Sequence, residues 1–239
     1  MMEKKPESEQ YDLKAMGKGW LKRTGYPTLH VSNAVFDEAK QTYSVEFKQT
    51  GYEAHSDPDE RYPWTIPVDW ALVTNGENVN QGVYVLQDGV GVLTVSNVTS
   101  APDFISVARD WSFFGEVADE ANNPSQKVKQ ALSDPDVINR YLAYRNIAEA
   151  EKALIIEHLL LKGEGSAEGS KNKASGDVKV SEGYLELFGS ILSDNKISGS
   201  TKALFLNVTE SIPSRPDLAH RYKVITGLSE RVIRIIDTL

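Results

Sequence analysis

The chain has 239 residues and a formal net charge of −8, and 40% of its residues are hydrophobic and 25% charged. This composition is ordinary for a folded globular protein and excludes a disordered or collagen-like chain. It has no cysteine, which excludes disulfides, thiol catalysis and thiolate metal sites and suits a reducing cytoplasm. No apolar run reaches about 18 residues and the first ten residues are polar, so we expect neither a membrane span nor a secretory signal.

The charges and aromatic residues are unevenly distributed. Residues 26–118 carry thirteen acidic and four basic side chains, and thirteen of the twenty-one aromatic residues. Such an acidic segment offers no phosphate-binding surface, so we expect no nucleic-acid partner. The composition therefore predicts three parts: an N-terminal helix in 1–25, a middle domain in 26–118 and a third domain in 119–239.

In the first part, the spacing of the apolar residues predicts a helix over 11–24. Leu13, Met16, Trp20 and Leu21 follow helical spacing, and Gly25 and Pro27 are typical of a helix end. We expect this helix to pack on the middle domain through Trp20 and Leu21, because burying such side chains is worth about 1.5–3 kcal/mol each.

The middle part changes to a period of two. In 41–49, Tyr43, Val45 and Phe47 alternate with polar residues, as in a half-buried strand. Similar runs occupy 28–33, 64–74, 82–87, 91–98 and 103–111. Asn75-Gly76 marks a turn, and Asp88-Gly89 between two valine-rich runs predicts a hairpin. Six or seven short strands indicate an antiparallel, Ig-like β-sandwich.

Helical spacing returns after Pro124. We expect a short helix over 124–132, then a long one over 136–162, with Ser133-Asp134-Pro135 as its N-cap. Its apolar face would carry Val137, Tyr141, Tyr144 and Ala148. Residues 163–177 predict an exposed mobile loop, because they are too polar to pack. Further helices are expected over 182–194, 200–208 and 216–239. The fold class is α+β: a sandwich followed by a helical domain of the helix-hairpin or solenoid type.

Catalytic and metal-binding patterns are missing. The four histidines, His30, His55, His158 and His220, do not pair at ligand spacing, and there is no H-E-x-x-H, Walker A, G-x-S-x-G or G-x-G-x-x-G pattern. His158 fits a helix cap or core border better than a catalytic role. We therefore assign no catalytic, cofactor-binding or metal-binding residue and no cofactor to this chain.

Three polar groups leave alternatives open. Asp57, Asp59 and Glu60 form either a solvated loop or a calcium site, and the spacing of an EF-hand is missing. Arg109-Asp110-Trp111 indicates a buried ion pair rather than a ligand contact. Arg140 and Arg145 are five residues apart, so at least one of them should face solvent or a neighbouring domain.

Four motifs, taken together, resemble the aminopeptidase N family of zinc metallopeptidases. Trp20 to Pro27 resembles the W-x-x-x-x-G-x-P that ends the family's catalytic domain. Pro63-Trp64-Thr65-Ile66-Pro67-Val68 resembles W-x-I-P-V, and residues 102–112 resemble P-x-x-L-S-x-x-R-x-F-S, both from its sandwich domain. Residues 134–143 resemble the D-P-x-x-x-N-R-W-x-A that opens its helical C-terminal domain.

The resemblance implies a noncatalytic C-terminal portion of such an enzyme, which removes N-terminal residues from peptides by a zinc-activated water. The sandwich would be a spacer, and the helices would help enclose the active-site chamber. Two departures stand out: Phe113-Phe114-Gly115 replaces a small residue and proline, and the zinc-binding domain is missing. The last helix runs to Leu239 with an apolar face, which indicates a truncated fragment or an edge covered by a partner.

Expected partners are thus the missing catalytic domain or another protein, with peptide substrate reached only through the parent enzyme. No nucleic acid or membrane partner is expected, and the location is the cytoplasm. The alternative is a stand-alone protein-binding or scaffold module. A sugar- or calcium-binding sandwich is a third, less favoured reading.

Overall fold

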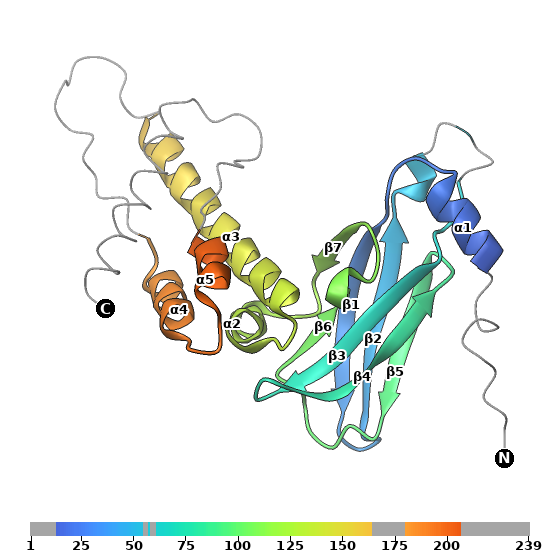
Figure 1. Ribbon diagram of the computed structural model, residues 1–239, viewed down its shortest axis with the longest axis horizontal. Coiled ribbons are helices and arrows are strands. Elements are labelled where there is room, and N and C mark those ends of the chain that lie inside the picture. Colours follow the sequence, from blue (N-terminus) through green and yellow to red (C-terminus); the bar gives the residue numbers. More distant parts are fainter. Residues whose placement is uncertain (1–12, 55–56, 58–60, 164–179, 207–239) are drawn as a thin grey trace. The chain divides into compact units, whose positions relative to one another are not determined.

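The computed structural model describes residues 13–54, 57, 61–163 and 180–206. The chain divides into two compact units, Met1–Arg140 and Tyr141–Leu239. The boundary between them falls inside a helix, α3 (Val137–Gly163), whose first turn belongs to the first unit. Figure 1 shows the order of the elements along the chain.

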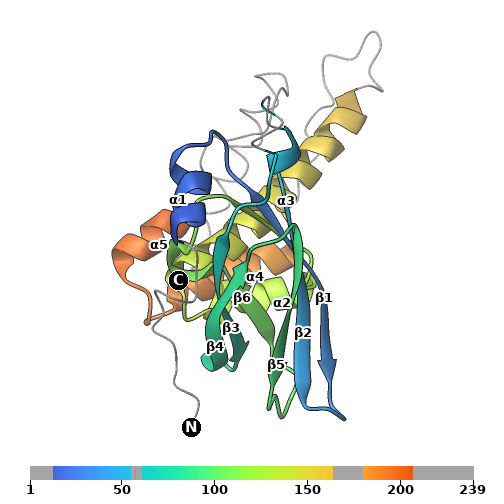
Figure 2. The same cartoon turned by 90° about the vertical axis from the view of Figure 1, so that its right-hand side faces the viewer.

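The first unit contains an Ig-like β-sandwich, as predicted. One sheet has the order β5-β2-β1-β7 and the other the order β4-β3-β6, and Figure 2 shows both sheets. The described strands are β1 (Thr28–Asp37), β2 (Thr42–Thr50), β3 (Ile66–Thr74), β4 (Glu77–Leu86), β5 (Val90–Ser96), β6 (Phe104–Val107) and β7 (Glu116–Asp119).

Alternation along the strands builds the core between the sheets. Tyr43, Val45 and Phe47 of β2 are buried while their neighbours are half-buried or exposed. Their core partners come from every other strand except β7 and include Leu29, Val31, Ile66, Val68, Trp70, Leu72, Leu86, Leu93, Val95, Ile105 and Val107. The period-two pattern therefore predicted the correct inner face.

The turn signals had different outcomes. Asn75 and Gly76 both have positive φ, 53° and 74°, and join β3 to β4 in a two-residue hairpin of type I′ geometry. The hairpin predicted at Asp88-Gly89 is wrong, since β4 pairs with β3 and β5 pairs with β2 in the other sheet. Residues 87–89 instead cross between the sheets, where the Gln49 side chain and backbone bind Asp88 and Gly89.

The end of the sandwich also differs from the prediction. The strand expected over 103–111 stops at Val107, because Ala108, Asp110 and Trp111 have positive φ and form a short turn, η4 (Arg109–Trp111). The sequence pattern did not predict β7, which runs parallel to β1. This parallel pair completes a sandwich whose other strand pairs are antiparallel.

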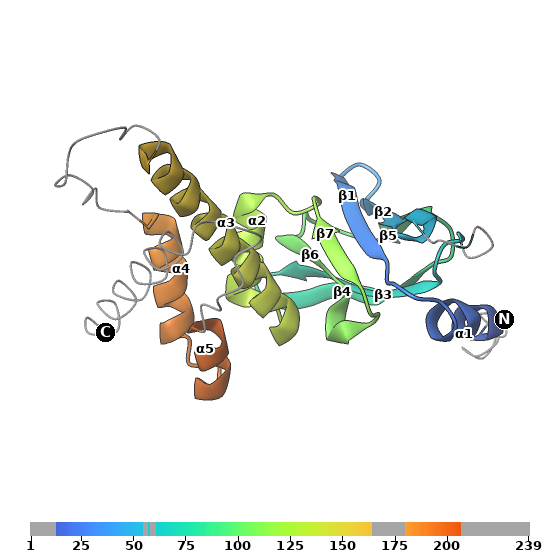
Figure 3. The same ribbon diagram turned by 90° about the horizontal axis from the view of Figure 1, so that it is seen from above.

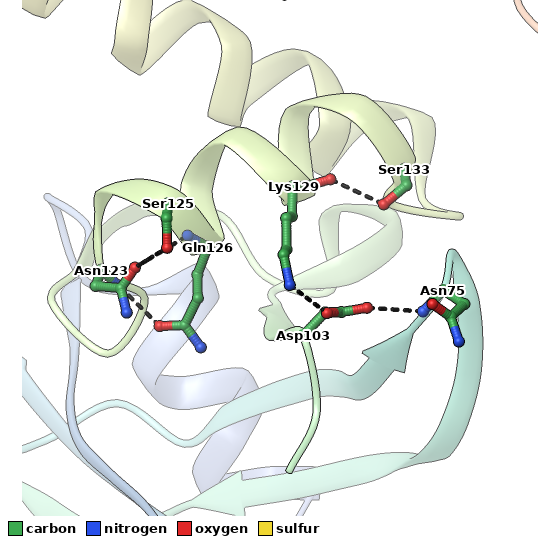
Figure 4. Close-up of polar contacts among 7 residues, drawn as sticks. All are labelled: Asn75, Asp103, Asn123, Ser125, Gln126, Lys129 and Ser133. Atoms are coloured by element: carbon green, nitrogen blue, oxygen red, sulfur yellow. Dashed lines mark hydrogen bonds and ion pairs between the residues drawn. The ribbon is translucent and has the colours of Figure 1, made fainter.

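Two helices of the first unit flank the sheets. Helix α1 (Leu13–Leu21) precedes β1, and α2 (Pro124–Ser133) lies beside β6 (Figure 3). Asn123 and Gln126 form a capping box at the start of α2 (Figure 4). Lys129 of α2 forms an ion pair with Asp103 at 2.5 Å, and the Asp103 carboxylate also accepts a hydrogen bond from the Asn75 backbone N–H. These contacts attach α2 to the β3–β4 turn.

The second unit is helical, as predicted. Its described elements are the remainder of α3, α4 (Glu182–Ser193) and α5 (Gly199–Leu206). Tyr144 and Ala148 of the predicted apolar face are buried and Tyr141 is half-buried, but Val137, the first residue of α3, is 50% exposed. The predicted loop beyond Gly163 and the predicted helix over 216–239 lie outside the described residues.

Candidate functional site

The first pair of family-like motifs meets at the start of the sandwich. Trp20 of α1 donates from Nε1 to the Thr65 carbonyl at 2.8 Å, and its ring lies 6.3 Å from the buried ring of Trp64. The prediction that Trp20 packs on the sandwich is confirmed. The same prediction for Leu21 is wrong, because its side chain is 86% exposed.

Arg23 completes this contact. Its guanidinium lies 3.7 Å from the centre of the Trp64 ring and 4.4 Å from that of Tyr62, and it donates to the Tyr62 carbonyl. A buried guanidinium stacked between two aromatic rings is a favourable cation–π arrangement. Arg23 therefore ties the end of α1 to the segment before β3, a role that sequence analysis did not assign.

The second pair of motifs meets on the outer face of the three-stranded sheet. Asn139 of α3 donates from Nδ2 to Ser106 Oγ at 2.9 Å and to the Val107 carbonyl at 2.8 Å, and all three residues are buried. Residues 102–112 and 134–140 thus contribute to one largely buried polar network, which we call the α3 joint. It fixes the first turn of α3 against β6.

Asp136 is the N-cap of α3. Its Oδ1 accepts from the backbone N–H groups of Ile138 and Asn139 at 2.9 Å each, and its Oδ2 accepts from that of Asp110 at 2.8 Å. The predicted cap at Ser133-Asp134-Pro135 is therefore wrong, because the cap is the next residue along the chain, Asp136. Asp134 instead follows the end of α2, and Pro135 precedes the true cap.

Asp134 is the most buried carboxylate of the joint. It accepts from the Asp136 backbone at 2.9 Å and from Gln130 Nε2 at 3.0 Å, and the Ser106 hydroxyl also bonds to it. Burial raises its pKa, and these hydrogen bonds oppose the increase only in part. The joint therefore contains a carboxylate for which ionisation is costly.

The arginines of the joint have separate roles. Arg109 is buried and donates to Asn78 Oδ1 of β4 at 2.9 Å. Burial raises the pKa of Asp69, and the positive charge of Arg109 opposes this increase. Asp110 is exposed and contributes its backbone N–H, so the predicted Arg109–Asp110 ion pair is not formed. Arg140 is buried and donates to the Ala131 carbonyl, while Arg145 is exposed, as expected of at least one of the two.

The second unit has its own buried polar contacts. Tyr144 and Tyr184 share a hydrogen bond of 2.8 Å between their hydroxyls, and burial raises the pKa of both. Glu151 of α3 accepts from the backbone N–H and the hydroxyl of Ser181, the N-cap of α4, at 2.6 and 2.8 Å. These bonds join α3 to the start of α4.

The described residues contain no cluster of three histidines, aspartates or glutamates that could hold a metal ion. His30 lies on β1 and contacts Thr50 Oγ1 at 3.1 Å. His55, His220, Asp59, Glu60 and the side chain of His158 lie outside the described parts, so the calcium alternative stays open. Within the described ranges no helix has the length and hydropathy needed to cross a membrane.

Comparisons with known proteins agree with this architecture. Residues 25–120 match a family model described as "Domain of unknown function (DUF3458) Ig-like fold". No curated protein matches the chain. Its structure is similar to the crystal structure of Legionella pneumophila aminopeptidase A in complex with aspartic acid, with a TM-score of 0.64 and 16% identity.

That similarity covers 97% of this chain and 24% of the aminopeptidase, so the chain spans about a quarter of that protein's length. An Ig-like sandwich followed by helices is thus an arrangement found in an aminopeptidase. The resemblance drawn from the four motifs is confirmed at the level of the fold.

Proposed function

We propose that this chain is a noncatalytic C-terminal region of an aminopeptidase N-like zinc metallopeptidase. The zinc and the residues that activate water would lie on a catalytic domain outside this sequence. The sandwich would act as a spacer, and the helices that follow it would help to enclose the chamber in which peptides lose their N-terminal residues. The lack of cysteines suits the cytoplasm.

The observation that carries this proposal is the pairing of the four motifs. Each motif is short, but Trp20 of the first contacts Trp64 of the second, and Asn139 of the fourth contacts Ser106 of the third. Chance matches would not be expected to meet in buried contacts between segments about 30 to 45 residues apart. The agreement in fold with an aminopeptidase supports the same assignment.

The α3 joint suggests how the region would work. Its buried bonds link the last part of the sandwich to the cap and first turn of α3, so neither segment can shift without breaking several of them. In the parent enzyme, the joint would hold the first turn of α3 against β6.

The natural protein tests this proposal directly. An antibody raised against the sandwich should isolate from the source cells either a polypeptide with a mass far above 26.5 kDa, the mass of this chain, or a tight complex with a metallopeptidase. The isolate should hydrolyse aminoacyl-coumarin substrates, and 1,10-phenanthroline should abolish the activity. A 26.5 kDa species without peptidase activity or peptidase partner would refute the proposal.

The alternative, a stand-alone protein-binding module, is favoured by one observation. Trp111 is 65% exposed and Phe114 is 72% exposed. Exposed aromatic side chains of this size are common at protein interfaces. The mass and activity of the isolated natural protein distinguish this alternative from the peptidase assignment.

A further inference from the structure

Strand β5 is the outermost strand of the four-stranded sheet, and within the described residues it pairs only with β2. In line with that register, the backbone N–H of Gln49 donates to the Gly89 carbonyl at 2.9 Å. Bonded and non-bonded pairs alternate along an antiparallel ladder, so the odd-numbered residues of β5 bond to β2. The backbone N–H and carbonyl groups that point away from β2 are therefore those of the even-numbered residues, Val90, Val92, Thr94 and Ser96.

This open edge is regular and carries no charge. It spans the seven residues Val90–Ser96, without a charged residue, a proline or a register shift against β2. Val90 and Val92 are 52% and 55% exposed, and no other part of the described chain forms a backbone bond to the open side. The edge ends where residues 87–89 cross to the other sheet and where Asn97 takes a φ of 61°.

The remaining edges of the described sandwich are covered, short or bulged. On the open side of β6, the side chains of Asn122 and Asn139 bond the backbone of Ile105 and Val107. Strand β7 has four residues, and the Lys127 side chain donates to its last carbonyl. Strand β4 has a bulge near its start, opposite the end of β3. Such features prevent pairing with another chain, and β5 is the one edge of the described sandwich without them.

The side chains beside the open edge define which strand fits it. On the outer face, Val90 lies opposite Lys48 of β2, and Val92 lies opposite Glu46. A strand added to β5 lies two strand spacings, about 10 Å, from β2, which long side chains can bridge. It would therefore best carry an acidic residue beside Val90 and a basic residue beside Val92. The inward-facing residues of β5 belong to the core, so the inward positions of the added strand would be apolar.

A second copy of the chain does not supply these charges. The two-fold register that pairs all seven residues of β5 is centred on Leu93, and it sets Val90 opposite Ser96 of the copy. Ser96 lies opposite Thr42, so the row that begins with Lys48 would meet only hydroxyl side chains. The net charge of −8 on each chain also opposes self-association. A segment with its own charge pattern fits the edge better.

We propose that the β5 edge binds a linear segment of another protein, which adds to the sheet as an antiparallel strand. The segment has apolar residues at its inward positions, an acidic residue beside Val90 and a basic residue beside Val92. In strand addition of this kind, main-chain hydrogen bonds supply the affinity and alternate side chains supply the specificity. This binding is independent of the peptidase assignment.

A synthetic peptide tests the binding on the purified 239-residue chain. The probe is acetyl-SVTVKVE-amide, whose antiparallel register sets its glutamate beside Val90 and its lysine beside Val92. In the free chain, the amide protons of Val90, Val92 and Thr94 should exchange rapidly, while those of Leu93 and Val95 are protected by β2. Peptide at about 1 mM should slow exchange at the first three, as measured by NMR. Slow exchange there without peptide, or no change with it, would overturn the proposal.

The charge pattern provides a second measurement. The peptide acetyl-SVTVEVK-amide exchanges the two charges and should bind the unaltered chain at least about threefold more weakly. A chain with both E46K and K48E should reverse this preference, because the charges of β2 are then exchanged as well. Equal affinities of the two peptides for the unaltered chain would refute recognition of the charges.

The main-chain bonds are tested by removing one donor from either partner. Val92→Pro removes an N–H that points away from β2, and it should weaken peptide binding at least about tenfold. Val92→Thr keeps that N–H and is the control, with a change below about twofold. The probe N-methylated at its lysine makes the same test on the unaltered chain, whether or not the proline variant folds. Undiminished binding of this peptide, or protection of the edge that grows with chain concentration alone, would refute strand addition by a partner segment.

Discussion

At the scale of single residues, buried side chains with polar atoms explain most of what the sequence pattern did not predict. Gln49 lies on β2 and is almost fully buried. Its amide donates to the carbonyls of Trp64 and Asp88 and accepts from the Trp64 backbone N–H, at 2.8 to 2.9 Å. A polar residue in a strand of alternating pattern gave no sign of this role, although its bonds hold the segment before β3 and the segment between β4 and β5, two of those that cross between the sheets.

Replacing Gln49 by methionine should therefore destabilise the chain strongly. The side chain is of similar size, but Gln49→Met leaves the buried backbone N–H and carbonyl of Trp64 without partners, at about 1–3 kcal/mol each, and also removes the bond to the Asp88 carbonyl. We expect a large drop in the urea concentration at the midpoint of unfolding, and tryptophan fluorescence measures this midpoint. Gln87→Met, on an exposed glutamine, is the control and should leave the midpoint almost unchanged. Equal midpoints for the two variants would contradict the role of Gln49.

The raised pKa of Asp134 leads to a prediction about how the stability of the chain depends on pH. Because burial raises its pKa in the folded chain above 3.8, its ordinary value, the folded chain takes up a proton more readily than the unfolded chain. The stability that this group contributes is therefore present at low pH and lost as the pH rises. Asparagine mimics the protonated form, so wild type should gain stability relative to Asp134→Asn as the pH falls from 7 toward 4.

Asp103 gives the matched control with the opposite sign. Lys129 and the Asn75 backbone N–H lower its pKa, so its contribution is present above 3.8 and is lost as the pH falls. Relative to Asp103→Asn, wild type should lose stability on acidification. Urea unfolding at several pH values measures both differences. The same trend for both variants would show that the pH dependence does not come from these carboxyls.

At the scale of elements, the strands with a buried face were predictable and the connections were not. Periodicity located β1 to β6 because one face of each is buried in the core. It missed β7, whose four residues are exposed or half-buried and whose parallel pairing with β1 leaves no local signal. Asp88-Gly89 has hairpin chemistry, but the tertiary bonds of Gln49 place it between the sheets.

Helix α1 should be attached to the sandwich through Trp20. Trp20→Ala removes the bond to Thr65 and the contact with the Trp64 ring, and we expect the unfolding midpoint to fall by an amount equivalent to about 3 kcal/mol. Leu21→Ala, one residue away on an exposed side chain, is the control. Thermal unfolding compares them, and an unchanged midpoint for Trp20→Ala would show that α1 contributes nothing to stability.

The α3 joint should depend on Asp136. Asp136→Ala leaves three backbone N–H groups without an acceptor, and loss of a helix cap alone costs about 0.5–2 kcal/mol. We expect faster amide hydrogen exchange in residues 138–141 and 110–112. Asp110→Ala is the control, because Asp110 contributes its backbone rather than its side chain to the joint. Equal exchange in both variants would contradict the capping role.

At the scale of the whole molecule, composition and motif order predicted more than local pattern did. The acidic, aromatic middle part corresponds to the sandwich, and four weak motifs indicated the fold that the structure shares with an aminopeptidase. The joint itself was not predictable, because Ser106 and Asn139 are separated by 33 positions and the two motifs that contain them carry no signal that they contact each other. Only the folded chain shows that the motifs meet.

The last prediction concerns the chemistry of the chain alone. The described residues offer no three-carboxylate or histidine group for a metal, and no two histidines of the sequence stand at ligand spacing. We therefore expect the purified chain, dialysed against zinc, to retain less than stoichiometric metal by elemental analysis and to leave aminoacyl-coumarin substrates intact. Under the proposed assignment, joining it to the catalytic domain of the parent enzyme should give hydrolysis, because the zinc-activated water would belong to that domain. One tightly held zinc per chain, or turnover by the chain alone, would place a metal or catalytic site in this chain and contradict the prediction.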